Sequence, residues 1–177
     1  MGFLVKASKG KKGIELGTFT GYSALCMAEN LPEDGHLITV DVNPETGKIA
    51  KKYWEEAGLS GKITAKIQPG TEVLDALLAD PAEKGTYDFA YVDADKPNYP
   101  NYLKKLIELM RPGGFIMFDN VLWGGKVADP DKRANDENTR MLYETVQLAL
   151  KDERVDTHTI KIGDGLAIVQ KNDHIIF

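Results

Sequence analysis

The chain has 177 residues, of which 42% are hydrophobic and 28% charged, so we expect one globular domain, residues 1–177, rather than a fibrous or disordered chain. Its formal net charge of −5 argues against the basic surface that binds nucleic acids and anionic membranes, and its apolar runs are far shorter than the roughly 18 residues of a membrane span. One cysteine, Cys26, and an amino terminus without a signal-peptide pattern predict a cytoplasmic protein.

Short apolar runs alternate along the chain with segments of helical periodicity, at the spacing of βαβ units. The predicted strands, in chain order, are residues 13–16, 36–41, 63–68, 87–93, 115–119, 155–161 and 166–171. The predicted helices are residues 21–30, 44–57, 71–79, 99–110 and 136–151. Arg111-Pro112-Gly113-Gly114 is expected to end the fourth helix, and residues 122–135, polar and glycine-containing, are expected to form a long loop.

The order of these elements predicts the fold class. Strand–helix alternation implies an α/β protein with a mostly parallel seven-stranded sheet and helices on both faces. Gly163-Asp164-Gly165 is a hairpin signal between the last two strands, so the last strand should run antiparallel. Such sheets bind ligands at the carboxyl ends of their strands, near the point where the strand order reverses.

A glycine-containing loop follows the first strand, with the pattern E-x-G-x-x-x-G from Glu15 to Gly21. Gly17 allows close approach of a ligand, but the pattern is not the G-x-G-x-x-G of dinucleotide sites. The carboxylate of Glu15 would repel a pyrophosphate and suits a cationic amino group. Asp41, which ends the second strand, is placed to accept hydrogen bonds from ribose hydroxyls. These residues favour S-adenosylmethionine; the alternative is an ordinary βα turn with a buried acid.

Three oxygen-bearing side chains follow the fourth and fifth strands. Asp93 comes after the fourth, and Asp119 and Asn120 come at the end of the fifth. If the two strands are neighbours, about 4.8 Å apart, these side chains converge. Two carboxylates and an amide carbonyl are hard ligands that suit Mg²⁺, Mn²⁺ or Ca²⁺. The alternative is that each residue caps the loop after its strand.

The chain resembles the cation-dependent O-methyltransferases of the caffeoyl-CoA and catechol type. The stretches that carry the resemblance are ELGTFTGYSA (15–24), YVDADKPNY (91–99), RPGGFIMFDNVLWGG (111–125) and IGDGL (162–166). It implies a Rossmann-like class I methyltransferase fold, and an enzyme that transfers a methyl group from S-adenosylmethionine to a hydroxyl of a catechol-type phenolic acceptor, with a divalent cation.

The resemblance also implies roles for individual residues. Lys96 matches the proposed general base, and Asp93 is placed beside it as a catalytic residue. The residues that match metal ligands are Asp93, Asp119 and Asn120. The residues implied to bind the methyl donor are Glu15, Gly17, Thr18, Ser23, Asp41, Thr71, Asp93 and Asp95.

Members of the family usually carry a further helical segment before the point where this sequence begins, and Phe3 to Ala7 reads as the end of its last helix. That segment is implicated in acceptor binding and in a homodimer. One alternative is therefore a non-catalytic or weakly active S-adenosylmethionine-binding module. A nucleotide-dependent oxidoreductase is the other, and it is disfavoured because G-x-G-x-x-G is absent from the sequence.

Two features near the fifth strand have alternative interpretations. Trp123 either lines the acceptor pocket, where its ring would stack on a phenol, or packs the loop onto the domain. Residues 126–140 carry many charges and form either a solvated loop or a loop that selects the acceptor.

Overall fold

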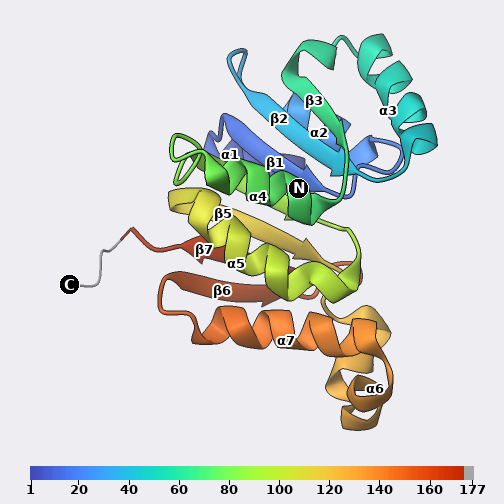
Figure 1. Ribbon diagram of the computed structural model, residues 1–177, viewed down its shortest axis with the longest axis vertical. Coiled ribbons are helices and arrows are strands. Elements are labelled where there is room, and N and C mark those ends of the chain that lie inside the picture. The colour runs from blue at the N-terminus through green and yellow to red at the C-terminus, as the bar shows by residue number, and fades with distance from the viewer. Residues whose placement is uncertain (174–177) are drawn as a thin grey trace.

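The predicted strands form one mixed sheet in the computed structural model, which describes residues 1–173 (Figure 1). The strands are β1 (Lys12–Leu16), β2 (His36–Asp41), β3 (Ile63–Ile67), β4 (Tyr87–Val92), β5 (Met110–Asp119), β6 (Val155–Ile160) and β7 (Leu166–Lys171). Within the described residues the sheet has seven strands in the order β3-β2-β1-β4-β5-β7-β6. The pairs β3–β2, β2–β1, β1–β4 and β4–β5 are parallel, and β7 is antiparallel to both of its neighbours, as the hairpin signal predicted.

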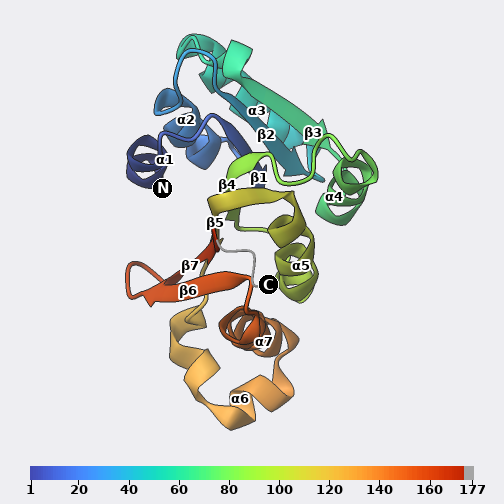
Figure 2. The ribbon, with the colours of Figure 1, turned by 90° about the vertical axis from the view of Figure 1, so that its left-hand side faces the viewer.

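Helices cover both faces of the sheet (Figure 2). One face carries α1 (Gly2–Ser8), α2 (Tyr22–Glu29) and α3 (Pro44–Glu56), and the other carries α4 (Gly70–Ala79), α5 (Tyr99–Leu109) and α7 (Glu137–Lys151). The shorter helical segments are η1 (Ser60–Lys62), η2 (Lys96–Asn98), η3 (Trp123–Ala128) and α6 (Pro130–Asn135). Within residues 1–173, no helix combines the length and apolar character that crossing a membrane requires.

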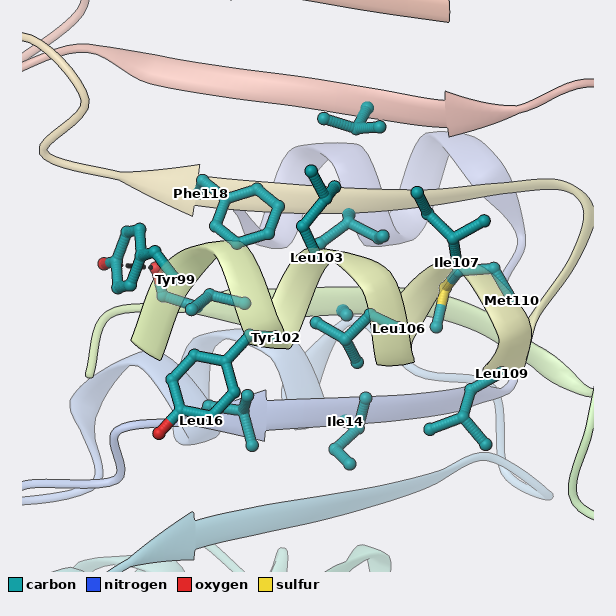
Figure 3. Close-up of a cluster of buried hydrophobic side chains, with 14 of the residues drawn as sticks. Ile14, Leu16, Tyr99, Tyr102, Leu103, Leu106, Ile107, Leu109, Met110 and Phe118 are labelled. Carbon is teal, nitrogen blue, oxygen red and sulfur yellow. Dashed lines mark hydrogen bonds between the residues drawn. The ribbon is translucent and has the colours of Figure 1, made fainter. Parts of the chain in front are cut away.

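The central strands are buried on both faces, so alternate residues of one strand enter different cores. In β5, Ile116 and Phe118 pack among α4, α5 and α7, whereas Phe115 and Met117 pack on the face of α1, α2 and α3. The α5 helix buries Tyr99, Tyr102, Leu103, Leu106 and Ile107, the i, i+3, i+4, i+7, i+8 positions of one helix face, against these strands (Figure 3). This packing fixes the start of α5, and with it the position of Tyr99 and of the residues just before it.

Two expectations about local structure are wrong. Residues 122–135 are not a long loop, because η3 and α6 occupy most of the segment. Asp129 is the N-cap of α6, and its side chain accepts from the backbone N–H of Asp131 (2.9 Å). Residues 111–114 do not lie outside the sheet but belong to β5. They form an irregularity in which Tyr87 pairs with Met110 while Phe89 pairs with Phe115.

The strand order reverses between β1 and β4, since β2 and β3 extend the sheet on one side and β5 to β7 on the other. In an open parallel sheet this point leaves a crevice at the carboxyl ends of the strands. The residues predicted to bind the cofactor and metal lie at or just after the carboxyl ends of β1 to β5.

Candidate active site

A cavity of about 630 Å³ opens at the carboxyl ends of β1, β2 and β4. The predicted cofactor residues that line it are Gly17, Ser23, Asp41, Thr71, Asp93 and Asp95. Glu15 and Thr18 are buried and do not line it. The structure therefore brings the predicted residues together in two layers, one at the cavity wall and one beneath it.

The loop after β1 crosses the ends of the strands with its backbone held to β2. The N–H groups of Gly17 and Thr18 both donate to the carbonyl of Val40, at 2.9 and 3.3 Å. Gly17 has φ +102°, in the left-handed region that disfavours a side chain. Glycine is therefore favoured here by backbone conformation alone; the close approach of a ligand stays a prediction.

Glu15 is fully buried, with both carboxylate oxygens occupied by hydroxyl groups. Ser23 donates to Oε1 and Thr39 donates to Oε2, and the Thr18 hydroxyl lies 2.6 Å from that of Thr39. Burial raises the pKa of Glu15 to about 7; the two hydroxyl donors oppose this shift, and the nearby carboxylates of Asp93 and Asp41 add to it. Ser23 lines the cavity wall, so Glu15 lies one hydrogen bond behind that wall.

Asp41 ends β2 with its carboxylate engaged by two backbone N–H groups. Phe19 N donates to Oδ2 at 2.7 Å, and Asn43 N donates to Oδ1 at 2.9 Å. Phe19 itself has φ +47° and an exposed ring at the cavity. Asp41 therefore both faces the cavity and ties the loop after β1 to the start of α3.

On the opposite wall, Asp95 is exposed and accepts from two neighbours. Its Oδ1 accepts from the Tyr102 hydroxyl and its Oδ2 from the Asn98 amide, each at 2.5 Å. Burial and this hydrogen bond raise the pKa of Tyr102, so its hydroxyl stays a donor. Thr71 lines the cavity in the first turn of α4.

A second cluster, next to the cavity, surrounds the ammonium group of Lys96. Nζ donates to Asp93 Oδ1 at 2.8 Å, to Asn120 Oδ1 at 3.0 Å and to the Tyr99 hydroxyl at 2.7 Å. Lys96 is buried, whereas Asp93 is exposed and also lines the cavity. The amine predicted to act as a base thus lies between two of the predicted metal ligands.

The third predicted ligand, Asp119, is oriented by a tyrosine from β4. Tyr91 OH donates to Asp119 Oδ2 at 2.5 Å, and the backbone N–H of Asn120 donates to Oδ1 at 2.7 Å. The hydroxyl of Tyr99 lies 3.0 Å from the Val92 carbonyl and 3.2 Å from that of Asp119. Burial raises the pKa of Tyr91 and Tyr99, so both remain protonated donors.

The donor set of this cluster fits a hard divalent cation. Within residues 1–173, no three His, Cys, Asp or Glu side chains gather as a metal site would require. A cation here therefore needs the amide oxygen of Asn120 beside the two carboxylates, which is the set the sequence predicted. Asp93 and Asn120 direct oxygens at one positive charge, the Lys96 ammonium, so these two side chains converge on a cationic group.

Trp123 is half-buried and packs against the core on the α5 side of the sheet, with Lys96 Nζ 5.9 Å from its ring centre. The packing interpretation thus describes part of its role, and its ring also faces the cluster. Residues that the sequence did not single out line the cavity as well: Phe19, Tyr22, Val42, Gln68, Asn98 and Tyr102. The tyrosines Tyr91 and Tyr99 were also missed. A signal existed for Tyr91, since a tyrosine inside an apolar run has a hydroxyl that needs a partner, whereas Tyr99 lies in a polar stretch that gives no such signal.

Comparison with known proteins agrees with the motifs. A sequence model of the family described as O-methyltransferase matches residues 1–172. A caffeoyl-CoA O-methyltransferase of Stellaria longipes is 40% identical over 174 residues, 97% of this chain and 72% of the relative. A probable caffeoyl-CoA O-methyltransferase of Arabidopsis thaliana is 41% identical over 174 residues, 97% of this chain and 75% of the relative.

Solved structures give the same result for the fold. The O-methyltransferase TomG of Streptomyces achromogenes, in complex with SAM, is 27% identical with a TM-score of 0.89, covering 97% of this chain and 77% of that one. An O-methyltransferase of Bacillus cereus, in complex with SAH, is 26% identical with a TM-score of 0.88, covering 97% and 78%. The expected class I methyltransferase fold is confirmed, and the chain belongs to the O-methyltransferase family.

Proposed function

We propose that the protein transfers a methyl group from S-adenosylmethionine to one hydroxyl of a catechol-type acceptor, and that the reaction requires a divalent cation, most simply Mg²⁺. The observation that carries the proposal is the position of Asp93. Its carboxylate lines the cavity and also accepts from Lys96 in the adjoining oxygen-rich cluster. The proposed donor site, which is the cavity, and the proposed acceptor site, which is the Lys96 cluster, therefore share Asp93 and lie next to each other.

The cavity supports the donor part of the proposal. Asp41 offers carboxylate oxygens for ribose hydroxyls, and Ser23, backed by buried Glu15, offers an acceptor for a cationic amino group. Thr71 lies in the first turn of α4, where backbone N–H groups have no partner within the helix. Two of the similar solved structures hold SAM or SAH, and this chain retains polar side chains suited to each part of that ligand.

The cluster supports the cation and acceptor part. Asp93, Asp119 and Asn120 would hold the cation, and Tyr91 would keep the Asp119 carboxylate oriented. When bound, a divalent cation lowers the pKa of an adjacent hydroxyl. Caffeoyl-CoA is the acceptor named for the relatives, and a vicinal diphenol of that kind offers two neighbouring oxygens to the site.

The residues of the chain supply position and proton transfer. Lys96 is the proposed base: as the neutral amine, with one proton fewer than the ammonium that donates three hydrogen bonds, Nζ would accept the proton of the acceptor hydroxyl, and Tyr99 and Asn120 hold that nitrogen in place. The loop after β1 and Asp95 hold the donor on the far side of Asp93. Because methyl transfer is a direct displacement by oxygen, the rate gain comes from holding the two reactants aligned.

A methylation assay over a panel of catechols, read by mass spectrometry, tests the proposal with and without EDTA. We expect methylated product that disappears in EDTA and returns with Mg²⁺. Full turnover in EDTA would contradict cation dependence, and donor binding without any turnover would favour the non-catalytic module, which the enzyme names of the relatives do not favour. The resemblance alone supports a cytoplasmic homodimer, for which light scattering is the test.

A further inference from the structure

Residues 120–125 follow Asp119 and include the start of η3. This segment, called the turn below, has an unusual backbone. Four of its six residues have positive φ: Asn120 at +62°, Trp123 at +48°, Gly124 at +61° and Gly125 at +81°. The first two are not glycine, and a side chain in this region costs about 1–2 kcal/mol per residue. Such a backbone persists only when its surroundings hold it.

The surroundings that hold this turn are the hairpin between β6 and β7. Asp164 accepts twice: its backbone carbonyl from Leu122 N at 2.9 Å, and its side-chain Oδ1 from Gly124 N at 2.6 Å. The carbonyl of Gly165 accepts from Val121 N at 3.1 Å. Three hydrogen bonds, from the N–H groups of residues 121, 122 and 124, therefore join the turn to residues 164 and 165, which belong to the IGDGL stretch.

Gly165 lets the two segments approach this closely. It has φ +87°, and a Cβ at this position would come within 2.4 Å of Leu122 Cγ and 3.0 Å of Leu122 N. Gly163, in the same hairpin, has φ +55°, but a Cβ there would meet nothing within 4 Å. The contact with the turn is thus specific to one of the two glycines.

The turn carries the groups that face the acceptor. Asn120 directs its amide oxygen at Lys96, and Trp123 presents its ring 5.9 Å from the same ammonium. We propose that Asp164 is a positioning residue for the acceptor site: by holding the backbone of residues 120–125, its carboxylate fixes the directions of Trp123 and Asn120. This inference rests on the proposed function, since it assigns the antiparallel hairpin to that site.

The first test compares Asp164→Ala with Asp164→Asn, whose amide oxygen can still accept from Gly124 N. We expect Asp164→Ala to lower kcat/KM for the catechol by about tenfold or more, the loss of one charge-assisted hydrogen bond. Calorimetry should find its affinity for S-adenosylmethionine unchanged, and Asp164→Asn should recover most of the activity. Asp156→Ala, which removes an exposed carboxylate from β6, serves as the control.

The second test does not depend on turnover. The chain has two tryptophans, so the ¹H–¹⁵N spectrum contains two indole signals, which Trp123→Phe assigns. We expect Asp164→Ala to move the Trp123 signal and leave that of Trp54 in place. Gly165→Ala should act like Asp164→Ala, while Gly163→Ala, also at a positive φ but without the clash, should not.

These readouts separate the inference from the proposed function. Wild-type protein that methylates no catechol would contradict the proposed function, and the indole signals would still decide whether Asp164 holds the turn. An unmoved Trp123 signal in Asp164→Ala, or an unchanged acceptor kcat/KM in an active enzyme, would overturn the inference. So would an Asp164→Asn variant as impaired as Asp164→Ala, because the retained acceptor oxygen would then be irrelevant.

Discussion

Gly17 lies against the backbone carbonyl of Asp93: a Cβ on Gly17 would come within 2.0 Å of that oxygen. The two residues follow neighbouring strands, and Asp93 N donates to the Leu16 carbonyl at 2.9 Å. The loop at the cavity and Asp93, which the cavity shares with the Lys96 cluster, are therefore joined by direct backbone packing.

The first prediction follows from this contact. Gly17→Ala should lose at least about tenfold in affinity for S-adenosylmethionine, because the backbone must leave its left-handed conformation and move away from Asp93. Calorimetry measures the loss. Gly58→Ala is the matched control, since Gly58 has φ +69° but a Cβ there meets nothing within 4 Å. Equal donor affinity in the two variants would show that the contact is unimportant.

Asp41→Ala should weaken donor binding by about 1–3 kcal/mol, the usual cost of losing charge-assisted hydrogen bonds. Part of this loss comes from the loop, because Asp41 also holds the backbone of Phe19. Asp41→Asn keeps one oxygen acceptor and should fall between the wild type and the alanine variant in calorimetry. If Asp41→Ala binds the donor as tightly as the wild type, Asp41 does not belong to the donor site.

Asp119→Ala should abolish cation-dependent turnover and leave donor binding nearly intact, because Asp119 belongs to the cluster and not to the cavity wall. Tyr91→Phe keeps the carboxylate but removes its hydrogen bond, so it should need about 10–100 times more Mg²⁺ for half-maximal rate. A turnover assay over a magnesium series, beside calorimetry with S-adenosylmethionine, distinguishes these effects. A fully active Asp119→Ala would favour base catalysis by Lys96 without a cation.

The pKa of Glu15 predicts a pH dependence of stability. Its folded-state pKa of about 7 lies above the ordinary value of 4.5, so the unfolded chain releases this proton first as pH rises. The contribution of Glu15 to stability is therefore complete below pH 4.5 and is lost as pH rises through 7. Glu15→Gln stays neutral at every pH. Its folding stability should therefore match that of the wild type near pH 5 and exceed it at pH 8 by on the order of 3 kcal/mol.

Thermal unfolding at the two pH values measures that difference. The hydroxyls of Ser23 and Thr39 can rotate to suit the amide, so the variant should fold. A constant difference between Glu15→Gln and the wild type from pH 5 to pH 8 would mean that Glu15 does not titrate in this range.

That Asp93 and Asn120 lie close together was predictable from the sequence because neighbouring parallel strands end at one edge of the sheet; that Asp119 joins them in holding a cation stays a prediction. The structure brings the oxygens of Asp93 and Asn120 within 3.0 Å of Lys96 Nζ. The buried position of Glu15 was less predictable. A glutamate near the end of a strand has the same sequence pattern whether it faces a ligand or lies beneath it. The hydrogen bonds from the hydroxyls of Ser23 and Thr39 show that Glu15 lies beneath the cavity wall.

The segment between β5 and α7 was the main error in the predicted elements. A helix of six residues is too short for periodicity to be recognised, and the two glycines at 124 and 125 suggested a loop. Asp129-Pro130 was a usable signal, since an N-cap aspartate followed by proline begins many helices. In β5, the Pro-Gly-Gly run resembles a turn, yet pairing with β4 both before it, at Met110, and after it, at Phe115, retains it in the strand.

The antiparallel strand β7 has a consequence for synthesis of the protein. Asp119 pairs with Leu166, and the hairpin before β7 supplies Asp164 and Gly165 to the turn at residues 120–125. Every residue that lines the cavity has been translated once Tyr102 is added. The turn beside the Lys96 cluster, in contrast, needs Asp164, more than forty positions downstream of Asn120. On the ribosome, where the chain emerges from its amino terminus, the two halves of the site should mature at different times, with the acceptor side completed last.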